Sequence, residues 1–279
     1  MGLPNSEKLD LNQKLDLLKK NLSSMEKVII AFSGGVDSTF LVRIAKEVLG
    51  DKAIALTARS STFPERELKE ASSFCLEQGI EHRIIVCDEL DDPEFGKNPP
   101  NRCYLCKKQL FGKILQVAAE LGISHVIEGS NVDDLGDYRP GRQALAELGI
   151  QSPLLEAGLT KEEIRLLSRN LGLPTWDKPS FACLSSRFPY GEEITKEKLK
   201  MVEQAEQYLQ NLGFRQVRVR HHGDVARIEV SAEDRPKFLQ GQIGEEVYKA
   251  FAEIGFAYTA LDLKGYRTGS MNEKITAGQ

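Results

Sequence analysis

The sequence predicts an α/β fold: a doubly wound parallel sheet followed by a smaller α+β C-terminal domain. Short apolar runs of strand type alternate with helical periodicity through the first two-thirds of the chain, as in parallel strands joined by crossover helices. A long irregular stretch, residues 174–194, contains three prolines and a glycine and interrupts this alternation. A mixed pattern of helices and strands follows it. We therefore expect one domain at 1–180 and a second at 181–279.

The first expected strand, Lys27–Phe32, is nearly all apolar and is followed by Ser33 and two glycines, as in a buried parallel strand. Ser38–Leu49 carries apolar residues at helical spacing and ends before Gly50. The other expected elements of this domain are strands at 53–57, 83–87 and 125–128, and helices at 64–79, 105–121 and after the capping box at 160–163. Sheets of this kind bind ligands where the carboxyl ends of the strands meet the loops.

The second domain is expected to begin with a helix at 195–212, followed by strands at 214–221 and 226–230 that a turn at 222–224 joins. More helix and a last strand at 257–263 complete the pattern. Alternation along the first of these strands places Arg218 and Arg220 on one face and Val217 and Val219 on the other. A solvated sheet face is the ordinary explanation for such charges.

The composition is that of a globular protein, with 41% hydrophobic and 28% charged residues. A formal net charge of −4 argues against binding nucleic acid through bulk phosphate neutralisation, although it is compatible with a local basic patch. The polar N-terminus lacks the apolar core of a signal peptide, and no run reaches the roughly 18–20 apolar residues of a membrane span. We therefore expect a cytoplasmic protein without a membrane partner.

A candidate phosphate loop lies at the first strand-to-helix turn and consists of Ser33, Gly34, Gly35, Val36, Asp37 and Ser38. The two glycines let the backbone approach a ligand and expose successive N–H groups, the helix adds its positive N-terminal end, and both serines add hydroxyls. A plain tight turn with a serine N-cap is the alternative, which the position between a buried strand and a periodic helix disfavours. The loop is not a Walker A motif, because it contains no lysine.

This loop resembles the SGGxDS signature of the PP-loop ATP pyrophosphatases, which have a fold of the adenine nucleotide alpha hydrolase type. Its members hold the pyrophosphate end of ATP and adenylate a substrate, so the resemblance implies ATP as a cosubstrate. Asp37 is a candidate Mg²⁺ ligand and catalytic residue, because this hard cation prefers carboxylate and phosphate oxygens. The resemblance also assigns Thr57 and Arg59, and Gly129 and Asp133, to loops of the ATP site. Ordinary turns are the alternative for both segments.

Five cysteines in a chain without an export signal favour metal binding or catalysis over disulfides. Cys103 and Cys106 form a C-x-x-C pair at the start of an expected helix, whose N-terminus would lower the pKa of both thiols. Cys183 lies in the irregular stretch, where the neighbouring charges of Lys178 and Arg187 would favour a thiolate.

Three interpretations of Cys103, Cys106 and Cys183 stay open. A structural zinc site ordinarily has four protein ligands, and the four histidines show no ligand spacing. A redox dithiol would suit a thioredoxin pattern, whereas this chain carries a nucleotide loop. A [4Fe-4S] cluster on three cysteines leaves one iron open to hold a sulfide. We favour the cluster, although spacing alone does not separate it from zinc. Cys75 and Cys87 are expected to be small core residues.

Longer stretches extend the resemblance over nearly the whole chain. They are Asp137-Tyr-Arg-Pro-Gly-Arg142, Ser152-Pro-Leu-Leu-Glu156, the segment from Lys178 to Glu192, and Gly265-Tyr-Arg-Thr-Gly-Ser-Met-Asn272. All are similar to the LarE family of pyridinium-3,5-biscarboxylic acid mononucleotide sulfurtransferases. That resemblance implies adenylation of two substrate carboxylates by ATP, sulfur delivery, and release of pyrophosphate and AMP. The product would serve the nickel-pincer nucleotide of lactate racemase.

Members of this family differ in their source of sulfur. One type has a single cysteine, matching Cys183, which gives up its own sulfur and becomes dehydroalanine. The other type adds a C-x-x-C pair and holds a [4Fe-4S] cluster whose open iron carries the sulfide. This chain matches the second type, so the resemblance implies Cys103, Cys106 and Cys183 as cluster ligands, a catalytic role for Cys183, and a sulfide donor. Tyr104 stands where the single-cysteine type has a tryptophan.

By the same resemblance, Arg218 and Arg220 clamp the phosphate of a nicotinate-derived mononucleotide, Arg267 assists them, and the chain forms a homo-oligomer. Two other functions stay open. A tRNA thiolase shares the loop and the three-cysteine chemistry, but the acidic net charge and the absence of an obvious RNA-binding module disfavour it. A nucleotide-binding sensor with a structural metal site would bind ATP without turnover.

Overall fold

The computed structural model describes residues 9–135, 140–180 and 182–267, and their internal contacts divide the chain into two compact units. Unit 1 consists of Met1–Arg59, Glu65–Cys87 and Cys103–Ser180. Unit 2 consists of Ser60–Pro64, Asp88–Arg102 and Phe181–Gln279, so it takes in two short segments from the first half of the sequence. Within these described ranges, none of the helices is both long and apolar enough to cross a membrane.

Parallel strands form the sheet of unit 1 in the order β3-β2-β1-β4. The strands are β1 (Val28–Ala31), β2 (Ala53–Arg59), β3 (Glu81–Val86) and β4 (His125–Ile127). The helices are α1 (Leu11–Ser23), α2 (Val36–Leu49), α3 (Glu65–Glu77), α5 (Arg102–Glu120), α6 (Pro140–Glu147), α7 (Pro153–Glu156) and α8 (Lys161–Asn170), with short 3₁₀ turns at Gly50–Lys52 and Val132–Leu135. The predicted alternation of strands and helices and the parallel sheet are confirmed.

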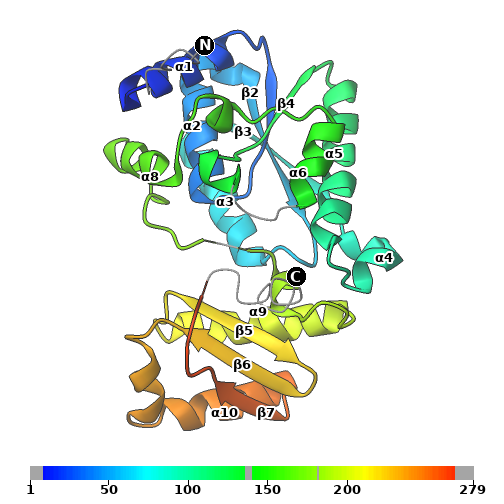
Figure 1. The fold of residues 1–279 in the computed structure, drawn as a ribbon, viewed down its shortest axis with the longest axis vertical. Helices are drawn as coiled ribbons and strands as arrows, with labels where there is room; N and C mark the ends of the chain where they lie inside the picture. The colour runs from blue at the N-terminus through cyan, green and yellow to red at the C-terminus, as the bar shows by residue number, and fades with distance from the viewer. Residues whose placement is uncertain (1–8, 136–139, 181, 268–279) are drawn as a thin grey trace, which may run out of the picture. The chain divides into compact units, whose positions relative to one another are not determined.

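Both faces of this sheet are covered, which confirms the doubly wound prediction. Successive side chains of a strand point to opposite faces. Val28 and Ile30 of β1 pack in a core shared with α1, α2, α3 and α8, whereas Ile29 packs in a second core with α5 and α6. Figure 1 shows α1 and α2 on one side of the strands and α5 and α6 on the other. Each fully buried aliphatic side chain of this kind contributes roughly 1.5–3 kcal/mol.

The loops after β1 and β4 share one edge of the sheet, because these strands are parallel neighbours. Main-chain hydrogen bonds extend both strands toward this edge. The Phe32 N–H donates to the Leu56 carbonyl at 2.8 Å, and the Glu128 N–H donates to the Gln151 carbonyl at 3.0 Å. The carboxyl-end edge predicted to bind ligands therefore carries the phosphate loop and the loop at 129–133 side by side.

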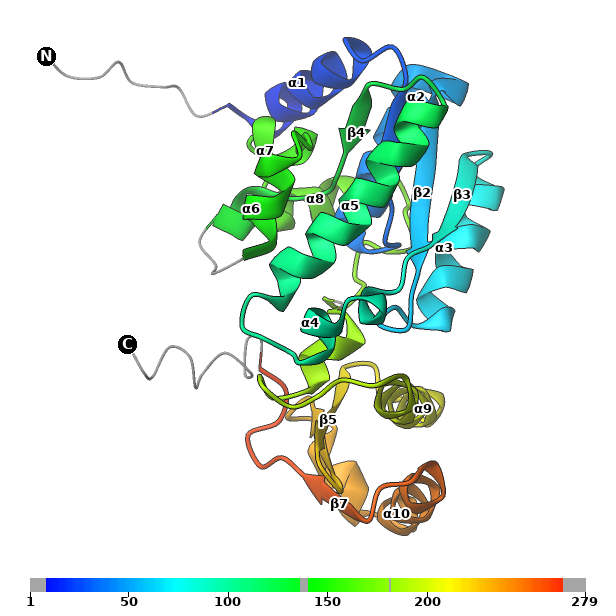
Figure 2. The ribbon, with the colours of Figure 1, turned by 90° about the vertical axis from the view of Figure 1, so that its right-hand side faces the viewer.

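Unit 2 is built on a sheet of order β5-β6-β7, with β5 (Val217–His222) and β6 (Val225–Val230) antiparallel and β7 (Tyr258–Leu261) parallel to β6. Helices α9 (Lys196–Asn211) and α10 (Ile243–Ile254) cover one face of this sheet (Figure 2). The remaining elements are α4 (Pro93–Gly96) and the 3₁₀ turns Glu89–Asp91, Leu184–Arg187 and Arg235–Leu239. This is the predicted α+β arrangement.

The first strand of unit 2 begins at Val217, not at Phe214 as predicted. Gly213 adopts a positive φ of 92°, and the Phe214 N–H returns to the Leu209 carbonyl at 3.2 Å. Phe214 therefore belongs to the C-terminal closure of α9, although it is as apolar and buried as a strand residue.

One carboxylate joins three elements of unit 2. Arg187, at the end of the 3₁₀ turn Leu184–Arg187, is 0% exposed and donates from Nε and Nη2 to both oxygens of Glu206 on α9, at 2.8 and 2.7 Å. Glu206 Oε1 also accepts the Val219 N–H of β5 at 2.9 Å. Burial would lower the pKa of Arg187, but Glu206 outweighs it and raises that pKa. Arg187 is therefore a buried cation that Glu206 compensates.

We expect Glu206→Gln to destabilise the protein by about 3–5 kcal/mol, because it removes the charge that compensates a buried guanidinium. Glu94→Gln is the matched control, since the Glu94–Lys97 pair is about two-thirds exposed and exposed pairs contribute at most about 1 kcal/mol. Urea unfolding followed by circular dichroism measures both. Equal effects of the two substitutions would contradict a structural role for the buried pair.

His82 on β3 predicts a pH dependence of stability in unit 1. Its Nε2 lies 2.8 Å from Thr57 Oγ1, whose hydroxyl donates to the Phe32 carbonyl at 2.8 Å. The single hydroxyl proton is thus engaged, so Nε2–H of a neutral ring is the donor to Thr57. Burial lowers the pKa of His82 in agreement with this assignment.

As the pH falls below about 6.5, the unfolded chain binds a proton at His82 before the folded chain does. The contribution of His82 to the free energy of unfolding is therefore fully present above that pH and is lost as the pH falls below it. We expect His82→Gln to reduce the loss of stability between about pH 7.5 and 5.5, measured by urea midpoints. His222, whose pKa burial and then Arg227 lower, acts in the same direction and remains in the variant. An unchanged pH profile would show that His82 does not couple to folding.

Candidate functional site

The backbone of the phosphate loop requires its first glycine. Gly34 has a φ of +66°, and a Cβ there would lie 3.3 Å from the Ala71 Cβ on α3. Gly35 is the N-cap of α2, and a Cβ on it would lie 3.4 Å from Ser33 Oγ. A side chain at Gly34 would therefore be strained in conformation and crowded by α3.

Open N–H groups line this loop. The Ser33 N–H donates to Ser38 Oγ at 3.3 Å, and the two serine hydroxyls lie 3.1 Å apart. In the part of the chain that the structure describes, the N–H groups from Gly34 to Ser38 find no acceptor. They coincide with the positive end of α2, a helix of 14 residues. The predicted phosphate loop therefore has the donors that an anion needs.

Asp37 in the first turn of α2 is a partly buried carboxylate, and its two oxygens have different surroundings. Its Oδ2 lies 2.5 Å from Lys161 Nζ. Its Oδ1 is buried and accepts no hydrogen bond from the described residues. Burial raises the pKa of Asp37, and Lys161 opposes that effect. An oxygen in this state fits the preference of Mg²⁺ for carboxylate ligands, so the prediction for Asp37 agrees with its surroundings.

Lys161 is a site residue that sequence reasoning missed. Its side chain reaches Asp37, and its backbone N–H donates to Asp133 Oδ2 at 2.6 Å. The sequence shows Lys161 only as the residue after Thr160, the N-cap of a confirmed capping box. That signal gives the start of a helix, but not the position of this helix beside the phosphate loop.

The loop after β4 lies against the start of α2. A Cβ built on Gly129 would lie 3.1 Å from the Ser38 nitrogen, so a glycine is needed for this approach. Glu128 fixes the loop by accepting the Ser130 N–H at 3.0 Å and the Ser152 hydroxyl at 2.6 Å. The structure therefore brings Gly129 and Asp133, two of the predicted ATP-site residues, to the phosphate loop.

Thr57 and Arg59 lie on β2, the other neighbour of β1. The Thr57 hydroxyl is used inside the sheet, where it contacts the Phe32 carbonyl and His82. Arg59 ends the strand with an exposed side chain that pairs with Glu65 at 2.6 Å. Their assignment to the adenosine end of ATP stays a prediction.

The cysteines fall into two groups. Cys75 and Cys87 are fully buried, as predicted, and burial raises the pKa of the Cys75 thiol to about 12. Cys103 is exposed and Cys106 is partly exposed, one turn apart at the start of α5 in unit 1. Cys183 is partly exposed and belongs to unit 2. Among the described residues, no group of three or more Cys, His, Asp or Glu side chains is placed to bind one metal ion.

The turn that carries Cys103 is packed against α6. The Tyr104 hydroxyl donates to Glu147 at 2.8 Å, and Lys108 donates to the same hydroxyl at 3.2 Å. A Cβ on Gly141 of α6 would lie 3.3 Å from the Cys103 carbonyl oxygen. The C-x-x-C pair is therefore held on a supported helical turn. Residues 136–139, which include the start of the Asp137–Arg142 stretch, lie outside the described residues.

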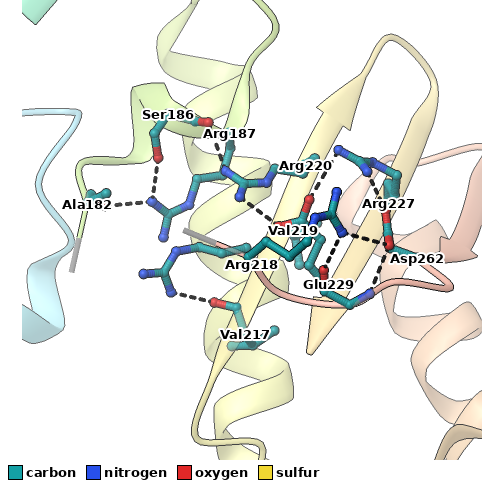
Figure 3. Close-up of polar contacts among 12 residues, drawn as sticks. Ala182, Ser186, Arg187, Val217, Arg218, Val219, Arg220, Arg227, Glu229 and Asp262 are labelled. Atoms are coloured by element: carbon teal, nitrogen blue, oxygen red, sulfur yellow. Dashed lines mark hydrogen bonds and ion pairs between the residues drawn. The ribbon is translucent and has the colours of Figure 1, made fainter. Parts of the chain in front are cut away.

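The predicted phosphate-binding arginines of unit 2 belong to one cluster, which consists of Arg187, Arg218, Arg220, Arg227 and Arg267. Glu229, fully buried, lies 2.7 Å from Arg220 and 3.2 Å from Arg227. Asp262 pairs with Arg227 and lies 3.7 Å from Arg267 (Figure 3). A third carboxylate, Glu206, pairs with Arg187 at 2.7 Å.

Arg218 lies close to a second guanidinium of the cluster, that of Arg187. In Figure 3 its guanidinium lies next to that of Arg187, and it stacks over the Tyr266 ring at 5.1 Å from the centroid. Burial, followed by the charge of Arg187, lowers the pKa of Arg218. An anion here would offset both effects. Arg218 and Arg220 are only 7% and 4% exposed, so the alternative of a solvated sheet face is wrong.

Lys178 and Arg187, the two basic residues expected near Cys183, also contact other groups. Arg187 donates from Nη1 to the Cys183 carbonyl at 3.0 Å and to the Ser186 hydroxyl at 2.9 Å, so it does contact the segment of Cys183. Lys178 Nζ is bound to Glu67 and Glu70 of α3 at 2.7 and 2.8 Å. Its charge is therefore compensated within unit 1.

Comparisons with known proteins match this chain to one family model and to several relatives. The NAD synthase family model matches residues 11–94, which include the phosphate loop. An uncharacterized protein of Synechocystis sp. is 46% identical over 95% of this chain and 99% of its own length. The tRNA-specific 2-thiouridylase MnmA of Chlorobium luteolum is 30% identical over 55% of this chain and 50% of its own length.

The pyridinium-3,5-bisthiocarboxylic acid mononucleotide synthase of Lactiplantibacillus plantarum is 39% identical over 92% of this chain and 93% of its own length. A match over 92% of this chain extends into both units. The chain therefore belongs to the family of the pyridinium-3,5-bisthiocarboxylic acid mononucleotide synthases, the LarE family.

Proposed function

We propose that this chain is an ATP-dependent sulfurtransferase that converts the carboxylates of a pyridinium-3,5-biscarboxylic acid mononucleotide to thiocarboxylates. The observation that carries the ATP-dependent part is the open row of N–H groups at the start of α2, with Asp37 and Lys161 beside it. The similarity to the synthase of L. plantarum supports the sulfur transfer and the substrate.

In the first step the phosphate loop binds the β- and γ-phosphates of ATP through its N–H groups. Asp37 Oδ1 is the candidate ligand for the Mg²⁺ that accompanies these phosphates, and Lys161 supplies a further positive charge. A substrate carboxylate oxygen then forms a bond to the α-phosphorus while the bond to the β-phosphate oxygen breaks. Pyrophosphate leaves, and charges already in place at the loop stabilise it.

In the second step a sulfur nucleophile forms a bond to the activated carboxyl carbon, and the bond to the AMP oxygen breaks. AMP leaves, and a thiocarboxylate remains. Repetition of both steps on the second carboxylate completes the product. The arginine cluster supports binding of the substrate phosphate, with Arg218 and Arg220 as the main partners and Arg267 assisting, because guanidinium groups bind phosphate oxygens and an anion would offset the burial and the Arg187 charge that lower the pKa of Arg218.

We assign the sulfur source to a [4Fe-4S] cluster on Cys103, Cys106 and Cys183. Thiolates are the ligands that such clusters require, and these are the three cysteines with exposed or partly exposed side chains. A cluster held by three cysteines would supply sulfide from its open iron. The assignment rests on the chemistry of these thiols and on the type of family member that the C-x-x-C pair indicates.

Other parts of the proposal rest on the resemblance alone. They are a role in making the nickel-pincer nucleotide of lactate racemase, an external sulfide donor, a cytoplasmic location and a homo-oligomeric state. The main alternative is thiolation of tRNA, since MnmA shares similarity with about half of this chain. The extent of similarity favours the mononucleotide, because the synthase of L. plantarum is covered almost completely. A nucleotide-binding sensor would show ATP binding without turnover.

Pyrophosphate release should require both ATP and the biscarboxylate mononucleotide. We expect Asp37→Asn and Lys161→Met each to lower kcat/KM by about 100-fold or more, because each removes a charge that acts on the phosphates. Lys52→Met, on the exposed surface of unit 1, is the matched control. If pyrophosphate release depended on tRNA and not on the mononucleotide, the proposed function would be wrong and tRNA thiolation would be the function instead.

Anaerobically purified protein should contain about four irons per chain. Cys103→Ala, Cys106→Ala and Cys183→Ala are each expected to lower the iron content, whereas Cys75→Ala, at a fully buried thiol, should retain it. Metal analysis gives the measurement. Zinc without iron after anaerobic reconstitution would refute the cluster. Intact mass after turnover separately tests whether Cys183 loses its own sulfur.

A further inference from the structure

The segment Trp176–Lys178 is fixed to α8. Arg165 donates from Nη1 to the Trp176 carbonyl at 2.6 Å and from Nη2 to the Lys178 carbonyl at 2.7 Å. Arg169, one turn further along the helix, lies over the Trp176 ring at 5.1 Å from its centroid. These contacts fix the backbone of Lys178 independently of its side chain.

The Lys178 ammonium joins α3 to the phosphate loop. It donates to Glu67 Oε2 at 2.7 Å, to Glu70 Oε2 at 2.8 Å and to the Gly34 carbonyl at 3.2 Å. The side chain is only 17% exposed. Burial would lower the pKa of Lys178, but the two carboxylates outweigh it and raise that pKa, so the group is a permanent cation. All three donor sites of the ammonium are thus used.

The contact at Gly34 determines the direction of the next N–H group. Gly34 C=O and Gly35 N–H belong to one planar trans peptide unit, in which they point in opposite directions. A cation that holds the carbonyl on the side of α3 therefore directs the Gly35 N–H to the opposite side. Gly34 has a positive φ of 66°, and a Cβ built on it would lie 3.3 Å from the Ala71 Cβ, so α3 leaves little room for a side chain at this position.

We propose that Lys178 is a positioning residue of the phosphate loop, which holds the Gly34 carbonyl so that the Gly35 N–H is oriented for the phosphates of ATP. This role rests on the ATP-binding part of the proposed function. Lys178 acts through the peptide unit and does not itself bind the nucleotide. Glu67 and Glu70 contribute to this positioning, because they hold the Lys178 ammonium in place.

The test measures binding of MgATP by calorimetry. We expect Lys178→Met to raise the Kd by about 10- to 100-fold, the effect of losing one charge-assisted hydrogen bond. Lys178→Arg should recover part of the affinity, because a guanidinium also donates several hydrogen bonds. In pyrophosphate release, KM for ATP should rise while kcat at saturating ATP changes less. Lys69→Met on the exposed side of α3 is the matched control and should leave the Kd unchanged.

The double substitution Glu67→Gln, Glu70→Gln separates positioning from direct binding. If Lys178 positions the loop, releasing its ammonium weakens MgATP binding in the same direction as Lys178→Met. If Lys178 binds the phosphates itself, its release leaves the affinity equal or higher, which would overturn the proposal. Equal Kd values for wild type and Lys178→Met would also overturn it, with folding verified by thermal melting. Failure of the wild type to bind MgATP would instead refute the proposed function.

Discussion

The arrangement of unit 1 depends on backbone N–H groups that must have no internal acceptor. The N–H groups of Gly34–Ser38 have no acceptor among the described residues. The neighbouring elements leave space around these groups. β1 ends where α2 begins, α3 presents the small Ala71 to Gly34, and the loop after β4 approaches Ser38 through Gly129. Buried polar groups without partners are costly, so such a loop is stable only where water or a ligand completes its hydrogen bonds.

The chain handles buried charge differently in its two units. Around the phosphate loop, each lysine is matched by carboxylates: Lys161 by Asp37, and Lys178 by Glu67 and Glu70. In unit 2 the carboxylates of Glu206, Glu229 and Asp262 lie among the arginines of the cluster. A chain with a formal net charge of −4 therefore contains a local concentration of arginines. Net charge alone would not indicate such a region.

The sequence was sufficient for features that follow from local pattern. The alternation of apolar strands and helices predicted the doubly wound sheet, and Thr160 with Glu163 predicted the start of α8. It was not sufficient where a contact joins distant segments. Lys161 lies 124 positions from Asp37, and Lys178 lies 144 positions from Gly34. Local propensity has no information on such pairs, since the packing of α8 and α3 around the loop creates them. The burial of Arg218 and Arg220 escaped prediction for the same reason.

The interleaving of the two units constrains how the protein folds during synthesis. The second unit draws on Ser60–Pro64 and Asp88–Arg102 as well as on Phe181–Gln279. These early segments leave the ribosome long before the sheet of unit 2 is made, so unit 2 becomes complete only after Phe181–Gln279 has been translated. Neither unit corresponds to one contiguous stretch of codons. Exchange of the whole of unit 2 between relatives by a single recombination event would therefore leave mismatched segments in both units.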